Sequence, residues 1–326
     1  MTFLPLRLRE AWNLGGFTPR QLAVRTWTMV NEREIMTRAA GVAFYAMLAF
    51  VPLLGLILTV VVQLLPDLTD LTGRGTGVGN MTVDQLRSTL QGIFPKEAYA
   101  VVEDQIRRLQ DQLKHRPPIG LFVVGLAVTL WLASSLYAAI IDAMNRIYGV
   151  VETRSIVKVR LVAIALTIFH AAIFLSALVA IVAWPQILRG LHVGNSAAWL
   201  LTAAKWAIVL LMVLFSFGLT FYYGPDADTR WEWITPGSLL GTLAFGAFTW
   251  VFRIYVQDFA NYNKTYGSLG GVMVLMFWLW VTSLVLLTAG QMNKIIEENS
   301  PLGKACGQKV DPLEKPDFAA TKTRSQ

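Results

Sequence analysis

The amino-acid sequence predicts an all-α membrane protein with six transmembrane helices, and three observations support this prediction. First, 55% of the 326 residues are hydrophobic and only 15% are charged, whereas soluble domains carry about 25% charged residues. Second, the apolar residues form long runs, and the run 272–289 holds no charged residue; about 18 such residues are enough for a helix that crosses a bilayer. Third, the chain has 11 Trp, a residue that collects at membrane interfaces.

Six apolar runs follow one another along the chain. The predicted spans are 39–65, 118–141, 161–184, 198–222, 236–257 and 266–296. Thr235, Pro236 and Gly237 begin the fifth span, because a capping hydroxyl followed by proline is typical of a helix start. Pro52 lies in the middle of the first span and removes one backbone hydrogen bond, which predicts a kink. We interpret the kink as a packing device or, alternatively, as a gating point.

The segments outside the membrane domain 39–298 are polar. Residues 1–38 are basic and amphipathic, and a short helix that starts at Thr18-Pro19 is expected along the membrane surface, either to sense lipids or to fix the topology. Residues 66–118 hold two helical patterns, which predict an external helical hairpin between the first two spans. Residues 299–326 contain proline without periodicity and are expected to be a disordered cytoplasmic tail.

The distribution of basic residues predicts the orientation. Six spans place both termini on the same side of the membrane, and that side holds 17 Lys and Arg against 9 on the other. Seven of the nine lie within 66–118, a long and charge-balanced segment that counts less in the positive-inside rule. We therefore expect both termini in the cytoplasm and 66–118 outside.

The second and sixth spans contain a weak internal repeat. Shifted by 148 residues, both end on Met-Asn-basic-Ile, at 144–147 and at 292–295. Transporter folds often contain repeats that are this weak. The alternative is coincidence in apolar sequence, combined with ordinary helix capping by Asn and Lys.

Ionisable side chains inside a bilayer are costly, so the few present are functional candidates. Lys205 and Arg253 share an outer depth and a positive charge; together they would form a cationic site for an anionic headgroup or solute, or else both would snorkel to the interface. His170 in the third span would either relay protons or bond a neighbouring carbonyl. Asp142 is expected to pair with Arg146, four residues further on.

Motifs for enzymes, metals and cofactors are missing from the sequence. The three His residues have no metal-binding spacing, and neither G-x-S-x-G nor a nucleotide-binding P-loop occurs. The single cysteine, Cys306, rules out a disulfide framework within the chain. The net charge of +7 is interpreted as a topology signal, so the sequence predicts no enzyme, no cofactor and no nucleic-acid partner.

Four segments resemble the YihY/virulence factor BrkB family of bacterial inner-membrane proteins, formerly mislabelled ribonuclease BN. They are AAGVAFYAMLAFVPLL, AMNRIYGV, YYGPDADTRWEWITPGSLLGTLAF and YGSLGGVMVLMFWLWVTSLVLLTAGQMN. The positions that match the family motifs are Asn145, Tyr148, Pro225, Pro236, Gly237, Tyr266, Gly267, Ser268, Leu269, Trp278 and Asn293. Where the family commonly has Gly-Ala-Glu-Leu-Asn, this chain carries Gln291 in place of the acid, which weakens a proton- or cation-coupling role at that position.

The resemblance implies six spans with cytoplasmic termini, a location in the inner membrane, and a transporter-like role linked to envelope integrity and lipid handling. We therefore expect a protein that moves or flips an amphiphilic or anionic solute, with membrane lipids as partners. Lys205 and Arg253 would attract the anion, and Asn145, Gln291 and Asn293 would line the inner end of a cavity. The alternative is a non-transporting scaffold that recruits an envelope protein through residues 66–118. The sequence predicts no oligomeric state.

Overall fold

A computed structural model describes residues 14–64, 69–70, 81–82, 119–190, 195–227, 235–258 and 268–299, together with the single positions 91, 99, 103, 104 and 107. In this part of the chain the regular structure is helical, except for one pair of short parallel strands, β1 (Thr69–Asp70) and β2 (Met81–Thr82). The helical hairpin predicted for 66–118 did not include this pairing.

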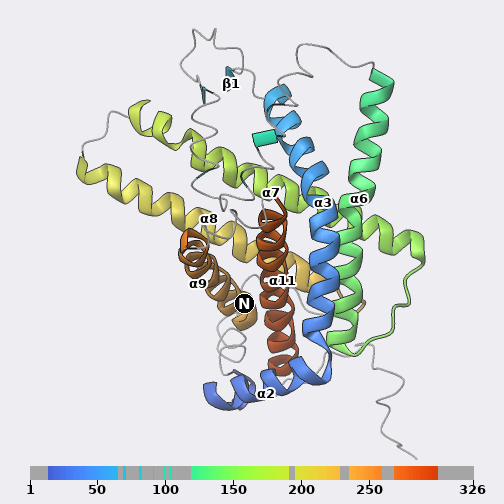
Figure 1. Cartoon of the computed structure of the whole chain (residues 1–326). Helices are drawn as coiled ribbons and strands as arrows, with labels where there is room; N and C mark the ends of the chain where they lie inside the picture. The colour runs from blue at the N-terminus through green and yellow to red at the C-terminus, as the bar shows by residue number, and fades with distance from the viewer. Residues whose placement is uncertain are drawn as a thin grey trace, which may run out of the picture.

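Six long helices form the body of the described structure (Figure 1). They are α3 (Ile35–Leu64), α6 (Ile119–Tyr148), α7 (Ile156–Gly190), α8 (Asn195–Tyr223), α9 (Pro236–Asp258) and α11 (Ser268–Glu298). Five of them, from α6 to α11, are long and apolar enough to cross a membrane, and α3 contributes the apolar segment Ile35–Phe50. These helices confirm the all-α membrane protein, while the count of six spans stays a prediction.

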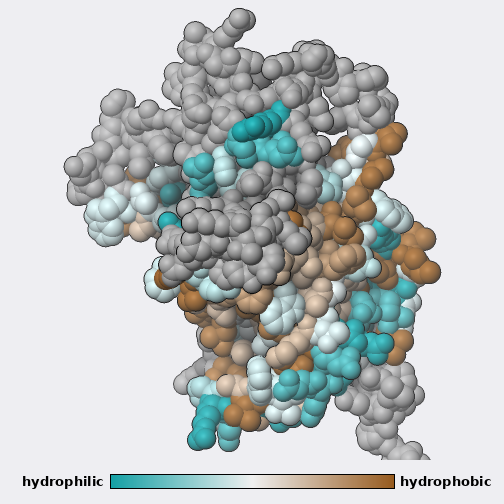
Figure 2. Space-filling view, viewed as in Figure 1, coloured by the Kyte–Doolittle hydropathy of each residue, from teal (hydrophilic) through white to brown (hydrophobic). Residues whose placement is uncertain are grey.

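The helices are arranged around α11 and α3. In Figure 1, α3, α6 and α11 stand side by side, α2 (Pro19–Glu32) lies across their lower end, and α7 and α8 run obliquely across them. We call this lower end the α2 end. On the face that Figure 2 shows, apolar side chains are prominent along the described part of the bundle, and polar ones gather at the α2 end. An apolar belt of this kind is expected on a surface that faces lipid.

The helix α2 forms for the reason that the sequence suggested. Gln21 donates its backbone N–H to Thr18 Oγ1 (3.3 Å), and the Thr18 N–H donates to Gln21 Oε1 (2.9 Å). This reciprocal pair is a capping box, which satisfies amide groups that the first helical turn leaves free. The short amphipathic helix is therefore confirmed. Its buried residue Leu22 packs against the last turns of α11, at Ile295 and Ile296.

The helix α6 continues past its predicted end at Ile141 to Tyr148. The hydropathy pattern did not predict the last two turns because they mix charged and apolar residues. Ala143, Met144 and Ile147 are buried on one side of the helix. The residue after the helix is Gly149, whose φ of 65° is a left-handed conformation that glycine adopts without strain. Its N–H donates to the Arg146 carbonyl and the next N–H to the Asn145 carbonyl, which is a Schellman cap.

The helices α9 and α11 approach each other closely at the α2 end. A side chain at Gly237 would collide with Asn293 Oδ1 and with the Ala289 carbonyl, and one at Gly241 would lie 2.7 Å from Ala289 Cβ. Small residues of this kind let membrane helices pack backbone against backbone. The helix α3 bends along its length (Figure 1) and includes Pro52, in agreement with the predicted kink.

Most of the predicted external hairpin at 66–118 lies outside the described residues. The described positions Tyr99, Glu103, Asp104 and Arg107 are helical. Tyr99 Oη donates to Glu103 Oε2 (2.7 Å), and Arg107 pairs with the same carboxylate, as one helical turn allows. The predicted tail beyond Asn299 and the first 13 residues also lie outside the described part of the chain.

Candidate functional site

The three amide side chains that the sequence proposed for the inner end of a cavity are all buried at the α2 end. They are Asn145 on α6, and Gln291 and Asn293 on α11. Met144, next to Asn145, lies against Gly290, next to Gln291, so the two helices meet in this layer. In the chain, Gln291 and Asn293 lie 146 and 148 positions after Asn145. The structure thus brings the three side chains into one polar layer between α6 and α11.

Asn145 uses both ends of its amide group. Its Oδ1 accepts the backbone N–H of Asp226 (2.7 Å), just beyond α8, and its Nδ2 donates to Glu152 Oε2 (2.7 Å) in the α6–α7 connector. A buried amide group with partners at both ends fixes its surroundings. Asn145 therefore holds three segments of the chain together, and we assign it a positioning role at this layer.

Asn293 has the equivalent bond on α11. Its Oδ1 accepts the backbone N–H of Gly237 (2.8 Å), in the first turn of α9 where amide groups lack helical partners. The two asparagines thus perform the same task, because each binds the amide that directly follows a proline, Pro225 or Pro236. This correspondence supports the internal repeat that the sequence suggested, which stays a prediction.

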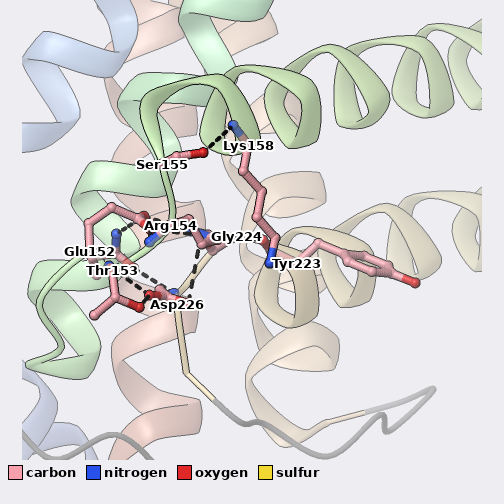
Figure 3. A network of polar contacts seen from close by, with 9 residues as sticks. Glu152, Thr153, Arg154, Ser155, Lys158, Tyr223, Gly224 and Asp226 are labelled. Carbon is pink, nitrogen blue, oxygen red and sulfur yellow. Dashed lines mark hydrogen bonds and ion pairs between the residues drawn. The ribbon is translucent and has the colours of Figure 1, made fainter.

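A network of charged side chains adjoins Asn145, and Figure 3 shows its members Glu152, Arg154 and Asp226. The guanidinium of Arg154 donates from Nε and Nη2 to the two oxygens of Glu152, each at 2.8 Å, and lies 3.7 Å from Asp226. It also donates to the carbonyls of Tyr223 (3.3 Å) and Gly224 (3.0 Å). These carbonyls end α8, where a positive charge is favourable. Arg154 therefore ties the α6–α7 connector to the end of α8.

The second carboxylate in the network, Asp226, is also fully engaged. Its Oδ2 accepts hydrogen bonds from Thr153 N (2.8 Å) and Thr153 Oγ1 (2.7 Å). We call the set Asn145, Glu152, Thr153, Arg154 and Asp226 the connector clamp. Sequence analysis missed all of its members except Asn145. The only signal was that Asp226 directly follows Pro225 in one of the segments that resemble the family.

The electrostatics of the connector clamp favour its charged form. Burial alone would raise the pKa of the Glu152 carboxyl, but hydrogen bonds from Arg154 and Asn145 outweigh burial and hold this pKa below its usual value. The hydrogen bond to Glu152 raises the pKa of Arg154, against the opposing effect of burial. Both groups are therefore ionised at neutral pH, and Glu152 and Arg154 form an ion pair within the clamp.

Gln291 differs from both asparagines because its polar oxygen is unsatisfied. The side chain is 1% exposed, and its Oε1 has no hydrogen-bond partner among the described residues. In the same part of the chain, Asn293 Nδ2 is also buried without a partner. Leaving such a group unpaired costs about 1–3 kcal/mol. A donor and an acceptor two residues apart on α11, on different sides of the helix, are thus unpaired among the described residues.

The predicted pair of Asp142 and Arg146 is wrong. Asp142 instead pairs with Arg38 of α3, at 3.2 Å between Nη1 and Oδ2. The reason is that α3 packs along α6 and brings Arg38 within reach, a long-range contact that the local spacing cannot reveal. Nearby, Lys294 is buried and pairs with Glu298 at 3.3 Å.

The predicted ionisable residues within the spans have defined surroundings. Lys205 Nζ lies 4.8 Å from the ring centre of Trp206 and 5.8 Å from that of Trp184, which are cation–π distances. Arg253 is exposed on α9. Their joint cationic site stays a prediction. His170 bonds the Leu166 carbonyl through Nδ1 (2.8 Å), as the local interpretation predicted, and its Nε2 lies 3.1 Å from the Ser216 carbonyl.

The remaining motif residues serve the packing where the structure describes them. Tyr148, Pro225 and Pro236 are buried, and the ring of Trp278 lies 6.3 Å from that of Phe245. Ser268 and Leu269 begin α11. Tyr266 and Gly267 lie outside the described residues. Among the residues that are described, no group of three or more His, Cys, Asp and Glu side chains is arranged to hold a metal ion.

The chain is similar to several bacterial proteins. YfkH of Bacillus subtilis (strain 168), whose name calls it ribonuclease-like, is 28% identical over 82% of this chain and 92% of its own length. A UPF0761 membrane protein of Glaesserella parasuis serovar 5 (strain SH0165) is 23% identical over 70% of this chain and 78% of its own length. No solved structure matches the chain.

The family comparison covers most of the sequence. Residues 26–312 match the family described as virulence factor BrkB, and the matched region includes the connector clamp and all of α11. The chain therefore belongs to the virulence factor BrkB family of membrane proteins.

Proposed function

We propose that the protein moves an amphiphilic or anionic substrate across its membrane, as a transporter- or flippase-like protein. The observation that carries this proposal is Gln291, a fully buried amide with an unpaired oxygen on an apolar helix. Polar groups inside membrane bundles are expensive and typically mark the path of a substrate or an ion. A purely structural helix would gain stability from an apolar side chain at this position.

The surroundings of Gln291 fit a substrate path. The unpaired Gln291 Oε1 supplies an acceptor that can bind the headgroup or polar end of a substrate, and the unpaired Asn293 Nδ2 supplies a donor on another side of α11. The connector clamp lies in the same layer and holds α6 to the end of α8. We interpret this arrangement as a state that is closed at the α2 end, with the clamp as the contact that opening would break.

The proposed setting is the bacterial inner membrane, with the α2 end in the cytoplasm. The excess of Lys and Arg on the side of the termini supports this orientation. In this setting the Gln291 layer lies toward the cytoplasmic side, and Lys205 and Arg253 lie toward the outer side, where they would attract an anionic substrate.

Purified protein in liposomes with fluorescently labelled phospholipids tests the proposal. We expect labelled lipid to change leaflet faster than in protein-free liposomes, and Gln291→Leu to slow this movement because it removes the free acceptor. Ser283→Ala is the matched control, since Ser283 is also buried on α11 but bonds the Leu279 carbonyl of its own helix. The control should retain the wild-type rate.

Lipid movement equal to that of protein-free liposomes, together with no uptake of anionic solutes, would contradict the transport proposal and favour the scaffold. Because one relative is named ribonuclease-like, the same preparations should also be assayed for RNA cleavage. Cleavage that survives in Gln291→Leu would assign an activity independent of this layer.

A further inference from the structure

An arginine lies at the middle of a candidate membrane span. The guanidinium of Arg160 on α7 donates from Nη2 to the Trp131 carbonyl of α6 (2.9 Å), and from Nη1 and Nη2 to Ser135 Oγ (3.3 Å each). Ser135 is 12 residues after Val123 and 13 before Tyr148, which are the ends of the candidate span on α6. At 1.5 Å per residue, the bonded guanidinium is therefore about 18–20 Å from either end of that span.

The path of the chain explains the height of Arg160. The predicted third span began at residue 161 and left Arg160 outside the membrane, whereas α7 begins at Ile156 and includes it. In Figure 1, the α6–α7 connector climbs from the lower end of α6, and α7 begins beside α6 instead of at the α2 end. The guanidinium carbon lies 3.7 Å from the ring centre of Trp131. Stacking and hydrogen bonds thus hold the side chain at this height, so it does not extend to the membrane surface.

The charge of Arg160 is uncompensated. Its three hydrogen bonds go to uncharged groups, its Nε is buried without a partner, and no carboxylate in the described part of the chain pairs with it. By contrast, Arg154 of the connector clamp pairs with Glu152 at 2.8 Å. An unpaired charge in the middle of a bilayer is expensive, so a residue of this kind is a candidate for a functional site.

The surroundings of Arg160 face lipid. Arg160 is half-buried, and on α6 the side chains of Trp131 and Val128 are 59% and 53% exposed. On α7, Val157 and Leu161 are exposed as well. Side chains that are exposed in the middle of a span are in contact with acyl chains. Tryptophan usually collects at the membrane interfaces, so its stacking with an arginine at mid-span is unusual. A ligand that reaches this arginine therefore comes from the lipid phase.

We propose that Arg160 binds the phosphate of an anionic phospholipid on the outer face of α6 and α7. A phosphate supplies the missing negative charge, and a guanidinium can bind it through more than one N–H. Nη1 donates one hydrogen bond among the described residues, so its second N–H can donate to the phosphate. Phosphatidylcholine would bring its own positive charge beside the arginine, so the site prefers a lipid with a net negative charge.

The inference deepens the proposed function and rests on it for the movement of the lipid, though not for its binding. A phosphate at mid-span has left the plane of the headgroups, as every lipid must when it changes leaflet. The inference names an anionic phospholipid as the substrate and Arg160 as a site halfway across the membrane.

Photo-cross-linking in liposomes tests the binding. The photoreactive residue p-benzoylphenylalanine replaces Val128, which is one helical turn from Trp131, in liposomes with equal amounts of phosphatidylcholine and phosphatidylglycerol. The matched control places the same residue at Leu211 of α8, a helix without arginine. Leu211 is 57% exposed and lies 12 residues from each end of its candidate span. Mass spectrometry of the cross-linked protein identifies the captured lipid.

We expect the probe at position 128 to capture several times more phosphatidylglycerol than phosphatidylcholine, and the probe at position 211 to capture the two lipids equally. In the first protein, Arg160→Gln should abolish the excess of phosphatidylglycerol. Lys158→Gln should preserve it, because Lys158 is an exposed basic residue of the same helix that takes no part in the bonds of Arg160.

Three results would overturn the proposal. They are equal lipid ratios at the two positions, an excess of phosphatidylglycerol that survives in Arg160→Gln, and cross-links from position 128 to a second copy of the chain instead of to lipid. The comparison of the two positions keeps Arg160 in place, so it does not depend on the folding of the variant.

Lipid movement measured in the same liposomes separates this inference from the proposed function. An excess of phosphatidylglycerol at position 128 without accelerated movement would support the binding site and contradict transport. Accelerated movement without the excess would support transport and overturn the binding site.

Discussion

Replacing Asn145 by alanine should destabilise the protein more than any other single amide substitution at the α2 end. The change removes the acceptor of the buried Asp226 N–H and the donor to Glu152. An unsatisfied buried amide costs about 1–3 kcal/mol, and the lost bond to a charged group is of similar size. Glu152 keeps its bonds to Arg154, which reduces the second contribution. We therefore expect a loss of about 2–4 kcal/mol in the free energy of unfolding.

The assay is unfolding by sodium dodecyl sulfate from mixed micelles, followed by tryptophan fluorescence. Asn293→Ala removes only the acceptor of Gly237 N–H, so about 1–3 kcal/mol is expected. Asn299→Ala is the surface control: this exposed side chain donates only to the Ile295 carbonyl of its own helix, and the change should stay within about 0.5 kcal/mol. An unfolding free energy for Asn145→Ala equal to that of Asn299→Ala would refute the clamp as a stabilising contact.

Three further predictions follow from the same region and from the spans. Folding lowers the pKa of Glu152 from 4.5, so the stabilisation from its charged form is fully present above pH 4.5 and is lost as the pH falls below that value. The stability of Glu152→Gln should lack this pH dependence. Unfolding of both proteins at several pH values measures the difference. Gly237→Ala should lower the free energy of unfolding by about 1–3 kcal/mol, because α11 leaves no room for a side chain at this position of α9. Gly246→Ala, also on α9 but where the space is open, is the control. Its free energy of unfolding should stay unchanged or rise by up to about 1 kcal/mol. Lys205→Ala combined with Arg253→Ala should slow the movement of anionic more than of neutral labelled lipid, and equal rates in wild type and variant would contradict the cationic site.

The apolar runs were sufficient to predict the helices, because length and hydropathy decide whether a segment can cross a membrane. The apolar runs did not predict where the helices end. The last two turns of α6 carry Asp142 and Arg146 on the outside and apolar side chains on the inside. A window average mixes the two sides, so it ended the span at Ile141, seven residues before the helix ends at Tyr148.

Only part of the candidate site was predicted, because its contacts join residues that are far apart in the chain. Asn145 and Asn293 were singled out by the repeated motif, and their role as acceptors for distant amides became visible only in the structure. Arg154 and Asp226 are 72 positions apart in the chain. No local spacing links them, so the connector clamp could not be predicted from one sequence. Lys205 was predicted as a candidate, but its aromatic neighbours Trp184 and Trp206 were not.

The two asparagine anchors have a consequence for the distribution of conformations. One anchor fixes Asp226 to α6 and the other fixes Gly237 to α11, so a rearrangement of this layer can release one anchor while the other holds. Release of one bond would cost about 1–3 kcal/mol. Since about 1.4 kcal/mol is a factor of ten in an equilibrium constant, the released form would make up from roughly 1% to roughly 15% of molecules. A ligand that prefers the released form by a few kcal/mol would then make it the major species.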